Sequence, residues 1–69
     1  MIVKYQMLQD KKVWDATMHQ LNSDTLLRHV QMKGGVADTN LNVRYCEETH
    51  KGEISDSNHT VIGNFQVFF

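Results

Sequence analysis

Cysteine and histidine are the residue types in this sequence most able to do chemistry, because they ligate metal ions and serve as nucleophiles or bases. Cys46, His50 and His59 follow one another with a Cys-x3-His-x8-His spacing inside a polar stretch rich in carboxylates. Three such side chains could in principle meet at one ion, but their spacing matches none of the patterns of structural zinc sites. Solvated side chains are normal in a polar stretch, so we expect neither a bound metal nor any other cofactor.

The sequence contains no catalytic constellation. Cys46 falls within a predicted strand, and an isolated cysteine usually behaves as a small apolar side chain. None of the serines lies in a Gly-x-Ser-x-Gly setting. Gly34 and Gly35 follow a helical pattern instead of preceding one, so we expect them to end a helix rather than to cradle a phosphate. The sequence therefore predicts a protein that is not an enzyme and has no catalytic residues.

Two features are better candidates for binding a partner. The polar stretch of residues 47–59 carries carboxylates that could mimic phosphate groups toward a basic protein, whereas an ordinary solvated loop is the competing interpretation. Two adjacent phenylalanines end the last predicted strand and offer either an edge for strand pairing or a patch for face packing. The candidate partner-binding residues are Glu47, Glu48, Glu53, Asp56, Phe68 and Phe69.

Tyr5, Trp14 and Tyr45 raise the alternative of a nucleic-acid-binding accessory protein. Aromatic side chains on a sheet stack against bases in some RNA-binding modules, and Arg44 with the scattered lysines could contact phosphates. The sequence has only six aromatic residues, however, and a small core needs their volume. Seven Lys and Arg against eight Asp and Glu give a net charge of −1, whereas nucleic-acid-binding domains usually carry a basic excess. A protein partner is therefore favoured over a nucleic acid.

Chain length limits the sources of stability. The 69 residues allow one small domain, residues 1–69, which buries only about 60% of the surface that its unfolded chain exposes. A single cysteine cannot form an internal disulfide and no zinc motif is present, so oligomerisation is the remaining means of stabilisation. A lone thiol fits a reducing compartment, and the sequence shows no secretory leader and no apolar run of membrane-spanning length. We therefore expect a cytoplasmic protein without membrane contact.

The segment with helical periodicity covers about residues 23–33. Its apolar residues are Leu26, Leu27 and Val30, a spacing typical of a helix with one narrow core-facing stripe. The Asn-Ser pair at residues 22–23 supplies a capping side chain for the first turn.

Alternating apolar and polar residues predict four strands around this helix. The short polar segment 9–11 joins the first two strands as a hairpin. The polar stretch of residues 47–59 is either a long hairpin loop or contains a short extra strand around residues 53–55. The fold class is thus α+β, a small antiparallel four-stranded sheet with one helix packed on one face in ββαββ order. The predicted strands cover residues 2–8, 12–20, 41–46 and 60–69.

A helix with one narrow stripe can cover only one face of such a sheet. The other face would hold an apolar patch that monomers seldom expose, so we expect it to be covered by a second copy, most simply in a two-fold homodimer, or by a different protein. The predicted function is a small protein-binding module, such as a regulator or an inhibitor of a larger assembly, that acts through a sheet edge, the sheet face or the 47–59 stretch. The expected patch draws on Ile2, Leu8, Val13, Ile62 and Phe68.

Overall fold

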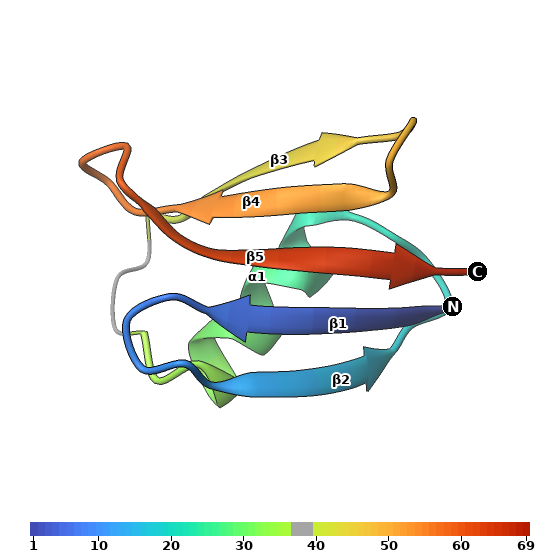
Figure 1. Cartoon of the computed structure of the whole chain (residues 1–69), viewed down its shortest axis with the longest axis horizontal. Coiled ribbons are helices and arrows are strands. Elements are labelled where there is room, and N and C mark those ends of the chain that lie inside the picture. The colour runs from blue at the N-terminus through green and yellow to red at the C-terminus, as the bar shows by residue number, and fades with distance from the viewer. Residues whose placement is uncertain (37–39) are drawn as a thin grey trace.

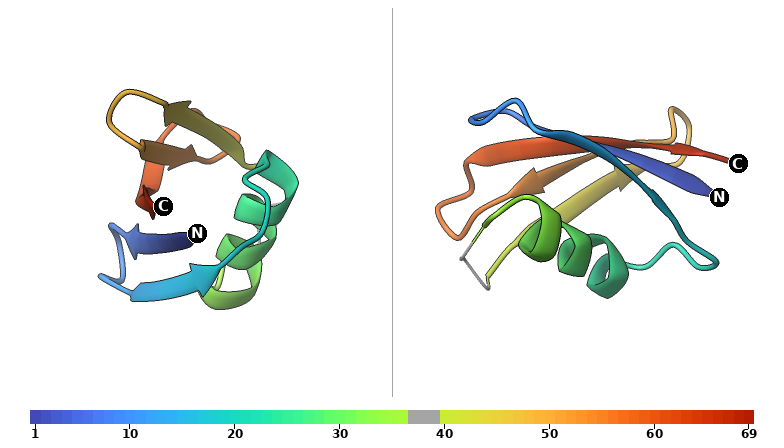
Figure 2. Two further views of the ribbon diagram at one scale, coloured as in Figure 1. Left: turned by 90° about the vertical axis from the view of Figure 1, so that its right-hand side faces the viewer. Right: turned by 90° about the horizontal axis from the view of Figure 1, so that it is seen from below.

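A single sheet and a single helix form two layers in a computed structural model that describes residues 1–36 and 40–69. The elements are β1 (Ile2–Met7), β2 (Val13–Thr17), α1 (Ser23–Lys33), β3 (Asn42–Cys46), β4 (Lys51–Ser55) and β5 (Val61–Phe68). All neighbouring strands are antiparallel, and their order across the sheet is β2-β1-β5-β4-β3 (Figure 1). The helix lies against one face of this sheet (Figure 2). The predicted α+β class is confirmed.

The predicted count of four strands is wrong, because the 47–59 stretch contains a fifth strand. β4 pairs with β3 on one side and with β5 on the other. Of the two alternatives for this stretch, a long loop or a short extra strand, the extra strand is therefore the one present. The sequence Lys51-Gly52-Glu53 is typical of a loop, because Gly52 takes the place of the apolar residue that would mark a strand between two exposed charged residues. A side chain at Gly52 would meet the ring of Phe65, which fills the space above this glycine.

α1 has the predicted bounds and the predicted ends. Asn22 caps it, since the backbone N–H of Thr25 donates to Asn22 Oδ1 at 2.8 Å. At the other end, the N–H of Gly34 donates to the carbonyl of Val30 at 2.8 Å, and the chain then leaves the helix through Gly35 with a φ of 68°. A left-handed φ of this kind is the conformation that glycine adopts without steric cost.

The buried stripe of the helix is narrower than the sequence predicts. Leu26 and Val30 are buried against the sheet, whereas Leu27 is only half-buried. β2 is also shorter than predicted, because the chain bends at His19 and Gln20 to reach the helix.

An aromatic row crosses the sheet on the face that α1 covers. The row consists of Trp14, Tyr5, Phe65, Gly52 and Tyr45, which lie opposite one another on the five strands. The ring centroids are 4.8 Å apart for Tyr5 and Trp14, 6.0 Å for Tyr5 and Phe65, and 6.1 Å for Tyr45 and Phe65. Each such pair stabilises the fold by about 0.5–1.5 kcal/mol beyond its buried area.

Tyr5 fixes the helix to the centre of this row. Its side chain is fully buried, and its hydroxyl donates a hydrogen bond to the carbonyl of Leu26 at 3.1 Å. Burial disfavours the phenolate and raises the pKa of Tyr5 above its usual value. The hydroxyl therefore stays protonated and keeps its role as a donor over the whole physiological pH range.

Candidate functional site

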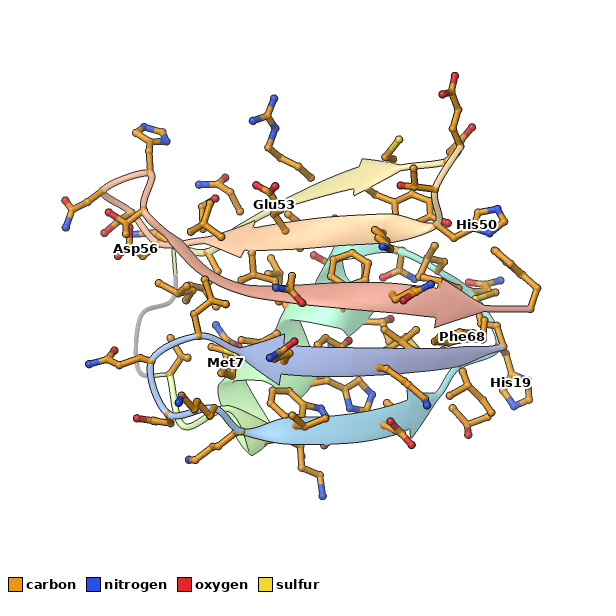
Figure 3. The ribbon with its side chains drawn as sticks, in the orientation of Figure 1. Met7, His19, His50, Glu53, Asp56 and Phe68 are labelled. Atoms are coloured by element: carbon orange, nitrogen blue, oxygen red, sulfur yellow. The ribbon has the colours of Figure 1, made fainter. Side chains whose placement is uncertain are left out.

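The second face of the sheet, which none of the described elements covers, is the largest candidate site. We call it the open face; it faces the viewer in Figure 1 and Figure 3, with α1 behind the sheet. Strand geometry places every second residue on it, because successive side chains of a strand point to opposite faces. Those residues are the neighbours of the buried core positions along each strand, so the same alternation that builds the core also determines the composition of the open face.

Cross-strand register sorts the open face into four rows. Rows B and C run across all five strands on either side of the aromatic row, and rows A and D lie toward the two ends of the sheet. Row A is Thr17, Ile2 and Phe68; row B is Asp15, Lys4, Gln66, Lys51 and Cys46; row C is Val13, Gln6, Asn64, Glu53 and Arg44; row D is Leu8 and Ile62.

The middle of the open face is polar and hollowed. A shallow depression of about 790 Å³ lies over β1, β5, β4 and β3, between rows B and C. Three side-chain amides and three charged groups surround it, so it presents both donors and acceptors of hydrogen bonds. The side chains around it are Gln6, Asn64, Gln66, Lys51, Glu53 and Arg44.

The charges of this region have no partners among residues 1–36 and 40–69. Arg44 and Glu53 are opposite one another on adjacent strands, and Lys51 is two residues from Glu53, yet none of the three forms an ion pair in the described part of the chain. These charges therefore remain free to interact with a bound molecule.

The apolar residues expected on this face are present, but they do not form one patch. Ile2 and Phe68 lie in row A with exposures of 45% and 42%, and Leu8 lies in row D with an exposure of 48%. Val13 is in row C at the sheet edge, and Ile62 is in row D. The expected apolar patch is divided, because the polar residues of rows B and C separate the two apolar ends.

The predicted partner-binding residues fall into separate places. Glu47 and Glu48 are exposed in the turn between β3 and β4, and Glu53 lies on the open face. Phe68 is at the end of β5 in row A, under the ammonium of Lys4 at 5.3 Å from the ring centroid. Figure 3 shows Glu53 midway along the strands and Phe68 at one end of them.

The two remaining candidates have structural contacts. Phe69 is 77% exposed, and its ring meets the imidazole of His50 edge to face at 4.9 Å. Asp56 lies at the opposite end of the sheet from Phe68 (Figure 3), and its Oδ1 accepts hydrogen bonds from the N–H groups of Asn58 and Thr60. The Asp56 carboxylate therefore shapes the β4–β5 turn, a local role that its sequence pattern, Asp-Ser-Asn, could have indicated.

Cys46 is an exposed thiol at the edge of row B. Hydrogen bonds from the side chain of Thr49, from the backbone of Thr49 and from the backbone of Glu48 lower the pKa of Cys46, because they stabilise the thiolate. The prediction of a buried apolar cysteine is thus wrong. The strand assignment was right, but the edge position of β3 and the turn that follows it were not visible in the sequence.

The three residues weighed as possible metal ligands, Cys46, His50 and His59, do not come together. His50 lies in the turn before β4 and His59 in the turn after it, so the length of a strand separates them. Within the described ranges, no three His, Cys, Asp or Glu side chains are placed to hold a metal ion.

Comparisons with family models, with curated proteins and with solved structures find no match to this chain. Among the described residues, no helix combines the length and the apolar character needed to cross a membrane.

Proposed function

We propose that this protein is a small non-enzymatic protein-binding module that presents the open face to its partner. The observation that carries this proposal is the hollowed middle of that face, where three unpaired charged groups and three amides surround the depression. Interfaces between proteins combine such hydrogen-bonding groups with apolar anchors. Ile2 and Phe68 at one end of the face and Leu8 at the other supply anchors of this kind.

The same geometry disfavours the alternative of nucleic-acid binding. The three rings that the sequence offered as a stacking platform do not lie on an exposed surface, because Tyr5 is fully buried and Trp14 and Tyr45 lie in the same row on the face that α1 covers. The open face also mixes both signs of charge, with Lys4, Lys51 and Arg44 against Asp15 and Glu53, instead of forming a basic surface.

We further propose that the protein acts in the cytoplasm as a regulator or an inhibitor of a larger assembly. The exposed acidic turn at Glu47 and Glu48 adjoins the depression through Thr49, so it extends the same surface toward a basic region of the partner.

Affinity capture from the native host tests the proposal with a matched pair of variants. Gln66→Arg places a long cation beside the depression, whereas Gln20→Arg makes the same change at an exposed position before α1. We expect the wild-type chain and Gln20→Arg to retain the same partner and Gln66→Arg to lose it. Retention of an identical set of proteins by all three chains would show that the open face is not the binding surface.

A further inference from the structure

The open face carries a pattern that is complementary to itself. Rows B and C lie at equal distances on either side of the aromatic row, and each strand contributes residues to both rows two positions apart. On β4, row B holds the cation Lys51 and row C holds the anion Glu53. On β5, both rows hold amides, Gln66 and Asn64. Farther out, rows A and D are both apolar on β1 and on β5.

We propose that a second copy of this chain packs on the open face, sheet against sheet, about a two-fold axis that runs across the strands along the aromatic row. This inference rests on the proposed function and names the partner of the open face as another copy. The two-fold rotation leaves each strand over its own equivalent and reverses its direction, so it exchanges row B with row C and row A with row D. An isologous contact of this kind is the commonest form of protein dimer.

Two kinds of polar contact follow from that exchange. Lys51 faces the partner's Glu53, and this opposite-charge contact occurs twice because the axis is two-fold. Gln66 faces the partner's Asn64, and two amides can donate and accept reciprocally.

The ends of the sheet match as well. Ile2 faces the partner's Leu8, and Phe68 faces the partner's Ile62, so each exposed apolar end covers the other. One arrangement therefore gives Lys51 and Glu53 opposite-charge partners and covers the apolar residues at the two ends. The other charged residues of rows B and C face uncharged residues of the partner.

Three other two-fold arrangements oppose like charges. An axis parallel to the strands through β5 sets Lys4 against the partner's Lys51. Two copies could also pair edge to edge through β3, with the two-fold axis at its central residue, and Arg44 would then face the partner's Arg44. The same edge pairing through β2 would set Asp15 against the partner's Asp15. Like charges directly opposite one another destabilise strand pairs. The pattern of charge thus disfavours these three arrangements relative to the axis across the strands.

The size of the face predicts a dimer of modest affinity. Five strands spaced by about 4.8 Å, each presenting about 20 Å of its length, give a face of about 500 Å² per subunit. Two such faces bury about 1,000 Å² in total, which is at the lower limit for a specific interface. We therefore expect dissociation in the micromolar range and not an obligate dimer.

Single and paired charge-reversal variants test this arrangement. The dimer dissociation constant of each intact chain is measured by sedimentation equilibrium from about 1 to about 300 µM, the range suited to an interface of this size. Lys51→Glu alone sets a new carboxylate against the partner's Glu53, and Glu53→Lys alone sets two lysines together, so each should weaken the dimer about tenfold or more. The double variant Lys51→Glu, Glu53→Lys restores the opposite-charge contact and should return the dissociation constant to within about threefold of the wild type. Arg28→Glu, on the exposed side of α1, is the charge-reversal control and should leave it unchanged.

Both reversed residues are exposed, so the variants should fold, and Leu8→Lys gives an independent variant that removes the contact with the partner's Ile2. A mass of 8.0 kDa at every concentration overturns the dimer. A double variant as weak as the single ones, or an equal loss in Arg28→Glu, overturns this arrangement of it. The proposed function is tested separately from the dimer. A chain that is monomeric but captures a partner protein, and loses it on Gln66→Arg, refutes the dimer and supports the proposed function.

Discussion

Gly52→Ala should destabilise the fold strongly even though it adds only one methyl group. The new Cβ would meet the ring of Phe65 and lie 2.7 Å from the backbone oxygen of Arg44, a contact that real Cβ atoms do not make. Overpacking of this kind costs about 1–3 kcal/mol. Displacement of the ring also weakens its contacts with Tyr5 and Tyr45, each worth about 0.5–1.5 kcal/mol.

One effect opposes this loss, because alanine is about 0.5–1 kcal/mol better than glycine within a strand. The net cost is therefore about 2–4 kcal/mol. A domain of 69 residues has a total stability of about 3–10 kcal/mol, so the variant should be largely unfolded or close to it. Urea denaturation followed by tryptophan fluorescence measures the change, since Trp14 belongs to the same aromatic row.

Two controls separate the collision from a general effect of the substitution. Glu53→Ala, next along the strand but on the open face, should change the free energy of unfolding by less than about 0.5 kcal/mol. Combining Gly52→Ala with Phe65→Leu removes the colliding ring, so the two changes should be less than additive. Wild-type stability in Gly52→Ala, or strict additivity in the double variant, would refute this account of the glycine.

Three further predictions concern α1 and the thiol. Leu26→Ala should cost about 2–5 kcal/mol in thermal or urea unfolding because Leu26 is buried, and Leu27→Ala should cost clearly less because Leu27 is half-buried; equal losses would contradict the assigned helix face. Asn22→Ala removes the cap of α1 and should cost about 1 kcal/mol, with Asn22→Ser close to the wild type in the same assay. The lowered pKa of Cys46 increases the thiolate fraction at a given pH, so alkylation by iodoacetamide should reach its plateau at a lower pH than for a free cysteine. Thr49→Val should move that profile toward higher pH, and an unchanged profile would show that Thr49 does not stabilise the thiolate.

Local signals in the sequence were sufficient for the helix and for four of the strands. The capping residue, the apolar stripe and the two glycines all lie within about residues 22–35, so nothing distant is needed to place α1. The alternation of apolar and polar residues is weaker in β4 than in the other strands, because Gly52 stands at a position that faces the core. The reason for a glycine there is the ring of Phe65 on the neighbouring strand, which fills the space of a side chain. A side-chain contact between two strands leaves no trace in the periodicity of either one.

The candidate site could be predicted in composition but not in arrangement. Alternation identified Ile2, Leu8 and Phe68 as residues of the uncovered face, which the structure bears out. Strand register determines that these apolar residues lie at two separate ends of the open face. It also determines that Glu53 of β4 lies opposite Arg44 of β3. Register is determined by the turns and by the core as a whole, so a single sequence without pairing information does not reveal which polar residues become neighbours.

The position of β5 in the sheet has a consequence for how the chain acquires its structure during synthesis. β1 with β2 forms one hairpin and β3 with β4 forms another, and among the described strands β5 is the one that lies between them in the sheet. Of the described strands, β5 is the last to be synthesised, so the two hairpins lack the strand between them until residues 61–68 have left the ribosome. Neither has enough sheet to be stable alone. Folding is therefore expected to be a single late event, in which insertion of β5 between the waiting hairpins closes the ladder and the core at once.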